Sequence, residues 1–445
     1  MKAPAGLLID ISPLRESRRF RAAFGARLVS VLGIGLLMVA LPVQVYELTG
    51  SSLHVAGVST AMAVALFVGS LGGGVIADRY DRRTVISLSR SAAGLAFLAL
   101  GINALLPDPF LAVIYAAAVT DGLAGGISGS AMMALVPMLV AREKVPAAGA
   151  LTTLTSDLGT MITPAIAGVL IARIGVSFAF FAAAAATVGT VSLIRAIGSA
   201  PPPAREIRNP LVELGHGIAF ALRHNVIRAV LVSGLLAMLV SGPLVLLPAF
   251  ADRALDAGPA TLGLLYAAPG AGAVLGSLTS GWLGRTRRNG LVLLGSLALM
   301  PLGVVMAGIW PQAAWSFLGL AAFGVARAVN GILRYAVLQQ NAPEDMRGRM
   351  SGLLMVQSVA GTAVGSMAAG AIGNLVEPGT ALVVYGAAVL VLFVFALVLV
   401  WPLYGLTAPA GGPPQPPPPA QVPVGGTIVE EKAAGAVAEE KKDGV

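Results

Sequence analysis

The stretch GGGVIADRYDRRTV, residues 72–85, places five charged side chains within six positions. The whole chain, in contrast, is 56% hydrophobic and only 11% charged. Soluble domains carry about 25% charged residues, so this composition indicates a membrane protein. We therefore expect the charge cluster to lie in a short loop outside the lipid, where it can set the topology and also serve a mechanism.

The apolar segments around this loop indicate spanning helices. Most exceed the roughly 18 residues that a spanning helix needs. Segments such as 28–41 and 381–400 are apolar on every face, which excludes the alternating pattern of barrel strands. We predict an all-α integral membrane protein with twelve transmembrane helices, at residues 22–45, 54–77, 85–105, 111–139, 148–171, 177–198, 226–249, 261–284, 290–309, 313–338, 351–375 and 381–404.

The basic residues predict the orientation of these spans. If segment 1–21 is cytoplasmic, the outer loops hold only Arg173 and Arg253. Such an excess of Arg and Lys on one side is typical of cytoplasmic loops and predicts that both termini lie in the cytoplasm. Segment 1–21 is itself basic, which argues against a cleaved signal peptide. The inner loops hold Arg79, Arg82, Arg83, Arg142, Lys144, Arg205, Arg208, Arg223, Arg285, Arg287, Arg288, Arg347 and Arg349.

The two halves of the chain repeat. GSLGGGVIADRYDRR at 69–83 aligns with GSLTSGWLGRTRR at 276–288, and GTMITPAIAG at 159–168 is echoed by GTAVGSMAAG at 361–370. Repeated six-helix halves are typical of transporters that bind substrate at the interface between the halves, near the middle of the membrane.

The domain organisation follows from this repeat. We predict a pseudo-symmetric pair of six-helix bundles, at 22–198 and 226–404, joined by a cytoplasmic central loop at 199–225. The segment 405–445 is rich in Pro and then mixed in charge, so it is expected to form a disordered cytoplasmic tail.

The charged loop resembles the G-x-x-x-D-R-x-G-R-[KR] signature of the major facilitator superfamily, with Asp81 in place of the second Gly. The resemblance implies that Asp78 faces the N-terminus of the eleventh helix, where unpaired amides favour a carboxylate. It would then act as a latch that closes the cytoplasmic side, whereas the alternative is that the charges only set topology and cap helices. In the second half Arg285 stands where Asp78 stands in the first, so that copy is expected to serve topology alone. The latch residues are Gly74, Asp78, Arg79, Arg82, Arg83, Arg347 and Arg349.

Three ionisable residues lie deep inside predicted spans. At about 1.5 Å per residue, Asp121 and Asp157 are near the midplane, and Arg327 lies somewhat below it. Charges at that depth are costly, so we expect them to couple protons or to contact substrate, with Arg327 meeting an anionic substrate or pairing with Asp121. The alternative for Asp121 is a hydrogen bond to backbone at a Gly-rich kink.

Other residues in the spans are assigned structural roles. Arg27, Arg90 and Arg334 lie close enough to the cytoplasmic face to extend their side chains to water. In the fifth span, the Thr163-Pro164 pair resembles a degenerate antiporter motif, and the bend and the packing of this helix are expected to depend on Gly159, Pro164 and Gly168.

Motif absences narrow the class of function. None of the five lysines follows a Gly, so the phosphate-binding loop of an ATP-driven pump is missing. No HExxH or GxSxG motif is present, so an enzyme is not expected. The chain has no Cys, its three His share no helix face, and its basic residues form no stripe, so we expect no cofactor, metal site or nucleic-acid partner. We predict a monomeric secondary transporter of a small molecule within the lipid bilayer.

A narrower resemblance covers about residues 11–405. The stretches FRAAFGARLVS, NALLPDP at 103–109 and GLLYAAPGAGAVLGSLTSG at 263–281 are similar to the enterobactin exporter branch of the superfamily. LQQNAPEDMRGRMSGL is shared more widely with macrolide-type drug exporters. The resemblance implies proton-driven export of a catecholate siderophore across the bacterial inner membrane. A multidrug or macrolide exporter, and a non-transporting scaffold or sensor, are the alternatives.

Overall fold

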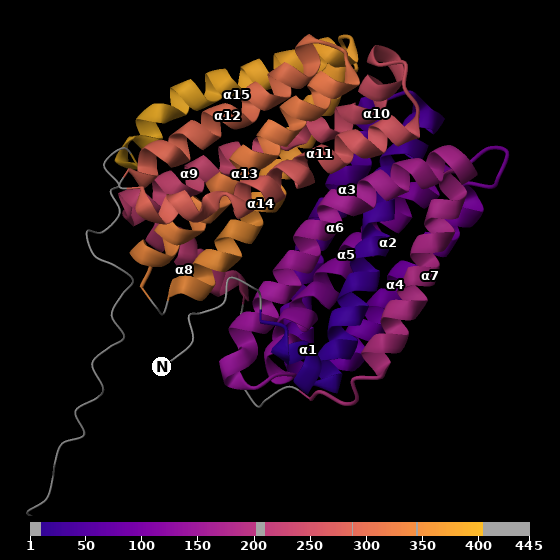
Figure 1. Cartoon of the computed structure of the whole chain (residues 1–445), viewed down its shortest axis with the longest axis vertical. Helices are drawn as coiled ribbons and strands as arrows, with labels where there is room; N and C mark the ends of the chain where they lie inside the picture. The colour runs from indigo at the N-terminus through magenta and orange to yellow at the C-terminus, as the bar shows by residue number, and fades with distance from the viewer. Residues whose placement is uncertain (1–9, 202–209, 287, 344–345, 404–445) are drawn as a thin grey trace, which may run out of the picture. The chain divides into compact units, whose positions relative to one another are not determined.

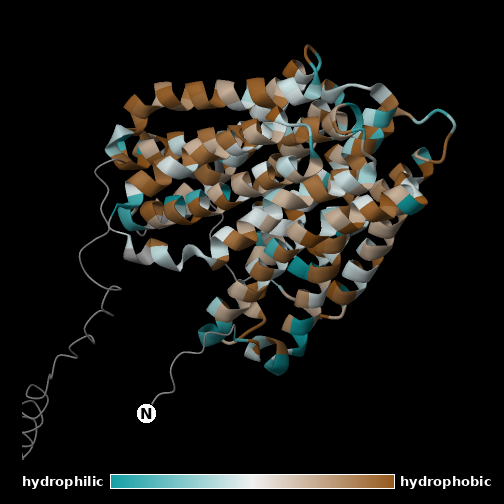
Figure 2. Ribbon diagram, turned by 45° about the horizontal axis from the view of Figure 1, so that its top comes forward, coloured by the Kyte–Doolittle hydropathy of each residue, from teal (hydrophilic) through white to brown (hydrophobic). Residues whose placement is uncertain are grey.

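The computed structural model describes residues 10–201, 210–286, 288–343 and 346–403. Twelve helices in this part of the chain are long and apolar enough to cross a membrane, as the sequence predicts. Figure 1 shows the helices of the first half, coloured indigo to magenta, as one group and those of the second half as another. Hydrophobic residues cover the spans, and hydrophilic residues gather near the helix ends (Figure 2).

The first bundle contains six long helices after the short helix α1 (Ser12–Glu16). Several begin with a side-chain cap, such as Ser17, whose hydroxyl accepts a hydrogen bond from the Phe20 amide. Gly50 ends the first long helix in the left-handed conformation, with a φ of 59°, as is usual for a helix C-terminus. The six helices are α2 (Arg18–Thr49), α3 (Ser52–Arg79), α4 (Arg82–Asn103), α5 (Leu111–Leu135), α6 (Val145–Ile174) and α7 (Val176–Arg195). Two short 3₁₀ helices, η1 (Val136–Met138) and η2 (Arg142–Lys144), link α5 to α6.

The second bundle repeats this arrangement with one irregular span. The chain first forms α8 (Pro210–Arg223), a helix within the segment expected as a central loop. The seventh span then consists of α9 (Asn225–Leu239), η3 (Gly242–Leu246), α10 (Leu247–Ala249) and the π-helical η4 (Phe250–Ala254). Pro243 and Pro248 lack the amide that a continuous α-helix needs, which accounts for the change of helix type. The remaining elements are α11 (Pro259–Leu278), η5 (Ser280–Arg285), α12 (Asn289–Ile309), α13 (Ala313–Asn341), α14 (Arg347–Gly373), α15 (Pro378–Val400) and η7 (Trp401–Leu403).

Small residues let the helices cross closely within each bundle. On α3, a Cβ added to Gly73 would lie 2.6 Å from the Cα of Ile127 on α5, so only Gly fits there. Gly69 meets α5 in the same way, and Gly276, which aligns with Gly69 in the sequence repeat, packs against Val325 on α13. The repeat detected in the sequence therefore corresponds to equivalent helix crossings in the two bundles.

The bundles meet through two further crossings, α6 with α11 and α3 with α14. A Cβ on Gly168 would lie 2.7 Å from the Cα of Gly263, and one on Gly370 would lie 2.6 Å from the Cβ of Ala56. Gly168 and Gly370 are the final residues of the second pair of repeated stretches, so each repeat contributes one glycine to the interface.

These crossings close one end of the bundles, which we call the Gly50 end. There, Arg253 Nη2 donates to the Gly50 carbonyl at 3.3 Å, and Asn374 Nδ2 donates to the Ser51 hydroxyl at 3.2 Å. The opposite end, which we call the Asp78 end, leaves open space at glycines of both bundles. A Cβ added there to Gly74 on α3 or to Gly352 on α14 would meet nothing within 4 Å.

Candidate functional site

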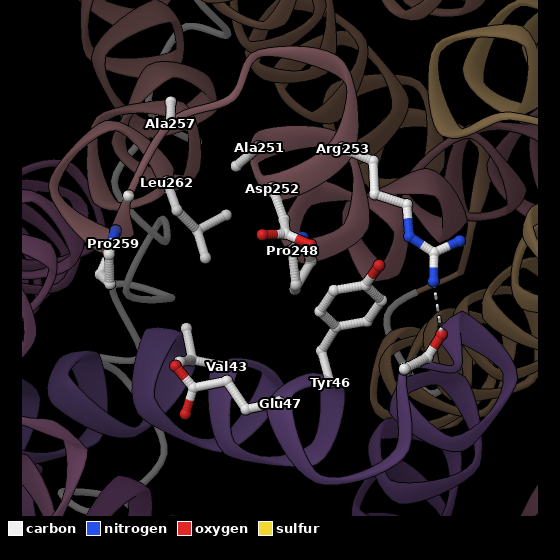
Figure 3. A pocket seen from close by; sticks show the side chains of 12 residues that line it. Val43, Tyr46, Glu47, Pro248, Ala251, Asp252, Arg253, Ala257, Pro259 and Leu262 are labelled. Atoms are coloured by element: carbon white, nitrogen blue, oxygen red, sulfur yellow. Dashed lines mark hydrogen bonds between the residues drawn. The ribbon is translucent and has the colours of Figure 1, made fainter.

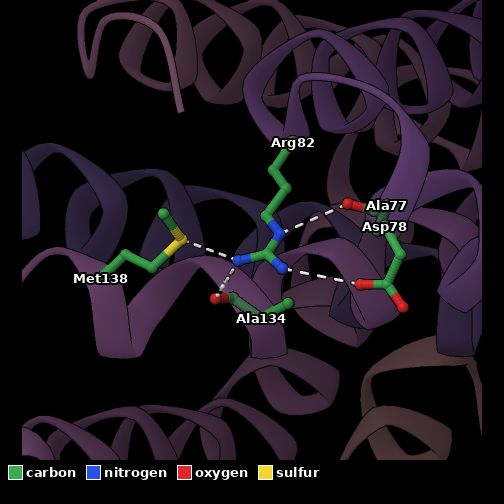
Figure 4. A network of polar contacts seen from close by, with 5 residues as sticks. All are labelled: Ala77, Asp78, Arg82, Ala134 and Met138. Atoms are coloured by element: carbon green, nitrogen blue, oxygen red, sulfur yellow. Dashed lines mark hydrogen bonds and ion pairs between the residues drawn. The ribbon is translucent and has the colours of Figure 1, made fainter. Parts of the chain in front are cut away.

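The charged loop at the Asp78 end is organised around Arg82. This side chain is only 7% exposed. Its Nη1 donates to the carbonyl of Ala134, near the end of α5, at 2.9 Å and contacts Sδ of Met138, in η1, at 2.7 Å (Figure 4). Its Nη2 lies 3.6 Å from the Asp78 carboxylate. Arg82 therefore ties α3, α4 and α5 together, and this buried structural role is one that sequence reasoning did not separate from the latch.

Asp78 itself remains available to a further partner. Its side chain is 49% exposed, and its ion pair with Arg82 occupies only one side of the carboxylate. Arg79 is exposed and Arg83 is half-buried. The side chains of Arg347 and Arg349, which sequence reasoning placed in the same cluster, lie outside the described residues, as does that of Arg285.

The departure from the loop signature at Asp81 has a structural reason. Asp81 caps α4, where its carboxylate accepts from the Thr84 amide at 3.0 Å. It also accepts from the Ser199 hydroxyl and the Ala200 amide, both at 2.7 Å, and so holds the segment after α7. Partial burial opposes ionisation, but these hydrogen bonds outweigh it and hold the pKa of Asp81 below its ordinary value. Its φ of −54° does not need a Gly.

The glycines before the loop divide between two surfaces. Gly73 faces α5, as described above, whereas a Cβ on Gly72 or Gly74 would meet nothing within 4 Å. Gly73 therefore lets another helix, α5, approach closely. The surface of Gly72 and Gly74 has space for a helix that is not packed there.

Two of the predicted intramembrane charges, Asp157 and Arg327, come from opposite bundles and interact. Both side chains are accessible, although their helix neighbours Thr155 and Ala326 are buried. Asp157 on α6 and Arg327 on α13 lie within electrostatic range of each other. The opposite charge that acts on Arg327 is therefore that of Asp157 in the other bundle, and not that of Asp121 as expected.

Asp121 interacts instead within its own bundle. Its electrostatic partner is Arg90 on α4, which is 9% exposed. Arg27 on α2 also lies within range of Arg90, and its Nη2 donates to the Ser156 hydroxyl at 2.8 Å. The prediction that Arg90 extends to water is wrong, because a carboxylate on the neighbouring helix lets its charge remain buried.

Arg334 and Gln357 lie close together in the second bundle, which sequence reasoning missed. Arg334 Nη1 and Gln357 Oε1 both lie beside Gly234, and neither atom has a hydrogen-bond partner. Gln357 Nε2 donates to the Leu231 carbonyl. A Gln inside an apolar span was the available signal for this site.

The glycines and the proline of α6 have separate tasks. Gly159 makes room for Val31 on α2, and Gly168 makes room for α11. Pro164 has no amide, so the carbonyl of Thr160 lacks its usual helix partner, and that carbonyl would lie 2.7 Å from a Cβ on Gly270 of α11. Pro164 therefore lies at the contact between the two bundles.

A pocket of about 360 Å³ lies between the bundles at the Gly50 end (Figure 3). Arg253 reaches over its rim, and its guanidinium lies 5.8 Å from the centre of the Tyr46 ring. Glu47 on α2 and Asp252 on η4 are among the lining residues. These charges stand singly near helix ends in the sequence, so no motif signals their proximity. In the described part of the chain, no group of three His, Asp or Glu residues could hold a metal ion.

Two six-helix bundles that pack at one end around charged interior residues define a secondary transporter. The family model described as "Major Facilitator Superfamily" matches residues 23–366 and 245–433. The chain belongs to the major facilitator superfamily, whose members are transporters and not enzymes.

Curated relatives cover nearly the whole chain. The protein named enterobactin exporter EntS from Shigella boydii serotype 18 is 39% identical over 391 residues, which are 88% of this chain and 94% of that protein. The protein of the same name from Escherichia coli O81 matches to the same extent. The chain is therefore a homologue of a bacterial exporter along almost its entire length.

Solved structures share the fold at low identity. The nucleoside transporter NupG aligns with a TM-score of 0.68 at 12% identity, over 86% of this chain and 99% of that one. A bacterial homologue of the iron transporter ferroportin, in an inward-facing state, aligns with a TM-score of 0.67 at 17% identity, over 87% and 99%. At these identities the likeness shows the fold alone.

Proposed function

We propose that this transporter exports a catecholate siderophore of the enterobactin type from the cytoplasm across the bacterial inner membrane. The observation that carries the proposal is the 39% identity to proteins named enterobactin exporter, over 94% of their length. The interior charges Asp157 and Arg327 are compatible with this substrate. A catechol hydroxyl can donate to the carboxylate, while an amide carbonyl or a phenolate can accept from the guanidinium.

The pair of Asp157 and Arg327 also gives a physical basis for the exchange of substrate with protons. A proton on Asp157 would remove the acceptor that the catechol hydroxyl uses, so proton and substrate would exclude each other at this residue. Mutual exclusion at one group couples the export of substrate to the inward flow of protons down their gradient. Asp121, with Arg90 as its counter-ion, is proposed as a second proton carrier in the first bundle.

The proposed orientation places the Asp78 end in the cytoplasm together with both termini. The support is the excess of basic residues in the loops at that end. The structure then corresponds to a state whose outer end, the Gly50 end, is closed.

The proposed latch acts in the opposite state. The antiparallel crossing of α3 and α14 places Gly370 beside Ala56 and the Ala363 carbonyl 3.5 Å from Thr60 Oγ1. If that register continues along both helices, Asp78 lies opposite the first turn of α14, which begins at Arg347. The free amides of that turn and the positive end of its dipole would stabilise the carboxylate.

Complementation tests the export function directly. The chain is expressed in Escherichia coli cells that lack their own enterobactin exporter, and enterobactin is quantified in the medium and in the cells. We expect secretion to be restored by the wild-type chain and lost with Asp157→Asn, whereas Asp108→Asn, in an exposed loop, should behave as wild type. If secretion stays at the level of the empty vector while macrolide resistance rises, the drug-exporter alternative replaces the proposal.

A further inference from the structure

We propose that Arg327 and Arg334 form a two-point binding site on α13, and that Arg334 selects ligands with two or more catechol groups over ligands with one. The inference rests on the proposed function for the chemical class of the ligand. It adds a second residue that contacts the substrate and gives a physical reason for preferring a large substrate.

Both arginines lie on one side of α13. They are seven residues apart, which is close to two full turns, so their side chains leave the helix in nearly the same direction about 10 Å apart. Gly331 lies between them on this side, and a Cβ added there would meet nothing within 4 Å. The opposite side of this stretch packs inside the bundle through the buried residues Ala326, Val329, Asn330 and Leu333. The two guanidiniums therefore share one accessible surface of the helix.

The two positions differ in their distance from the Asp78 end. Arg327 is the midpoint of α13, whereas Arg334 lies two turns closer to Asn341, where this helix ends before α14 begins at the Asp78 end. The bundles are packed together at the Gly50 end. A ligand that enters from the Asp78 end therefore passes Arg334 before it reaches Arg327.

Helices α9 and α14 pack against one edge of the Arg334 guanidinium. Gly234 on α9 leaves the room for it, because a Cβ at that position would overlap Arg334 Nη1 and Gln357 Oε1. Of the three nitrogens of Arg334, only Nη1 is buried without a partner. The side chain as a whole is half-buried, so Nε and Nη2 remain accessible to a ligand.

No contact within the protein neutralises either guanidinium. In the part of the chain that the structure describes, no hydrogen bond and no ion pair within 4.0 Å involves Arg327 or Arg334. The carboxylate of Asp157 acts on Arg327 from the other bundle, whereas none of the described carboxylates acts on Arg334. A cation inside a span is costly when it has no partner, so a ligand that accepts hydrogen bonds is favoured at Arg334.

A ligand with several catechol arms can use both positions. The phenolate or the amide carbonyl of one arm accepts from Arg327, and those of a second arm accept from Arg334. Once the first arm is bound, the second contact forms within the same complex and adds to the affinity. A single arm makes only one of these contacts. It should prefer Arg327, because a catechol hydroxyl can also donate to Asp157 there.

Binding of two matched ligands tests this in the intact chain. A tricatechol amide and a single catechol amide with the same arm are titrated by calorimetry against the full chain in lipid nanodiscs. Arg334→Gln should weaken binding of the tricatechol about tenfold and that of the single catechol less than about twofold, whereas Arg327→Gln should weaken both. Arg228→Gln is the matched control, because it removes an exposed arginine of α9 that donates to Asn225, and it should change neither affinity.

The ratio of the two affinities separates a contact with the ligand from a structural role. An equal loss for both ligands in Arg334→Gln, or unchanged binding of the tricatechol, would overturn the proposal. If this variant does not fold, Arg334→Lys keeps the cation but not the planar fork, and it should lower the ratio about threefold; an unchanged ratio would again overturn the proposal. A wild-type chain that binds neither ligand would instead reject the proposed function, and this inference with it.

Discussion

The Gly50 end and the Asp78 end of the bundles are built from the same four helices, α3, α6, α11 and α14, but only one of them is packed. At the Gly50 end, Gly168 and Gly370 bring backbones of opposite bundles into contact. At the Asp78 end, a Cβ on Gly149 of α6 or Gly352 of α14 would meet nothing within 4 Å. Glycine is costly in a helix when nothing packs against it. We therefore interpret the unpacked glycines as surfaces for a second state, in which the Asp78 end is closed.

Among the variants that test this comparison, Gly168→Leu should reduce export the most. The added side chain meets Gly263 and Pro259 of the opposite bundle, so it should force the Gly50 end apart. Overpacking of about 3 kcal/mol corresponds to about a 100-fold loss of the closed state, and we expect export to fall to a similar extent. Val169→Leu, at the next position of the same helix, is the matched control because Val169 is 53% exposed. Equal export rates of the two variants in vesicles would show that the packed end does not limit transport.

Arg327→Gln should weaken substrate binding while leaving both ends intact. A lost hydrogen bond to a charged group costs about 2 kcal/mol, or about 30-fold in the substrate concentration for half-maximal transport. In Asp157→Asn/Arg327→Gln the two losses should not add, because each single change already removes the interaction between the bundles. Transport measured over a range of substrate concentrations checks this. Strictly additive free-energy losses in the double variant would show that the two residues act independently.

Asp78→Asn should affect only the closing of the Asp78 end. The amide retains the shape of the side chain but loses the charge that favours a helix N-terminus, which is worth about 1 kcal/mol. We expect export to fall about fivefold, with membrane insertion and thermal stability unchanged. If export by this variant equals that of the reference variant Asp108→Asn, the charges of the loop serve only to set the topology and to cap helices.

Asp81→Ala should have the smallest effect, on stability alone. It removes a helix cap and the hydrogen bonds to Ser199 and Ala200, at a cost of about 1 kcal/mol, whereas Asp81→Asn should keep part of the cap. Because the folded-state pKa of Asp81 is lowered, its contribution is present above the unfolded pKa of about 4 and is lost as the pH falls below it. Melting temperatures of wild type and Asp81→Ala should therefore converge between about pH 5 and pH 3. A difference that does not change over this range would assign the effect to packing.

The spans and the charged loop could be predicted from sequence because each depends on residues close together in the chain. Twelve apolar segments are twelve spans, and the loop signature placed Asp78 and Arg82 correctly at the end of α3 and the start of α4. The partners of the interior charges could not be predicted in this way. The position of Arg90 along its own helix does not reveal that Asp121 lies on the neighbouring helix. Glu47 and Asp252 line one pocket only because the two bundles pack together.

Cross-linking of the two ends tests the account most directly, because the chain has no Cys of its own. Ser51→Cys with Asn374→Cys joins the packed end, and Gly74→Cys with Gly352→Cys joins positions that the register of α3 and α14 places opposite each other when the Asp78 end closes. We predict that each disulfide forms in membranes, that each stops enterobactin export, and that a reductant restores it in both. The account requires that the Gly50 end and the Asp78 end close alternately during transport. Continued export by either cross-linked protein, or failure of the Gly74→Cys/Gly352→Cys pair to form a disulfide, would contradict it.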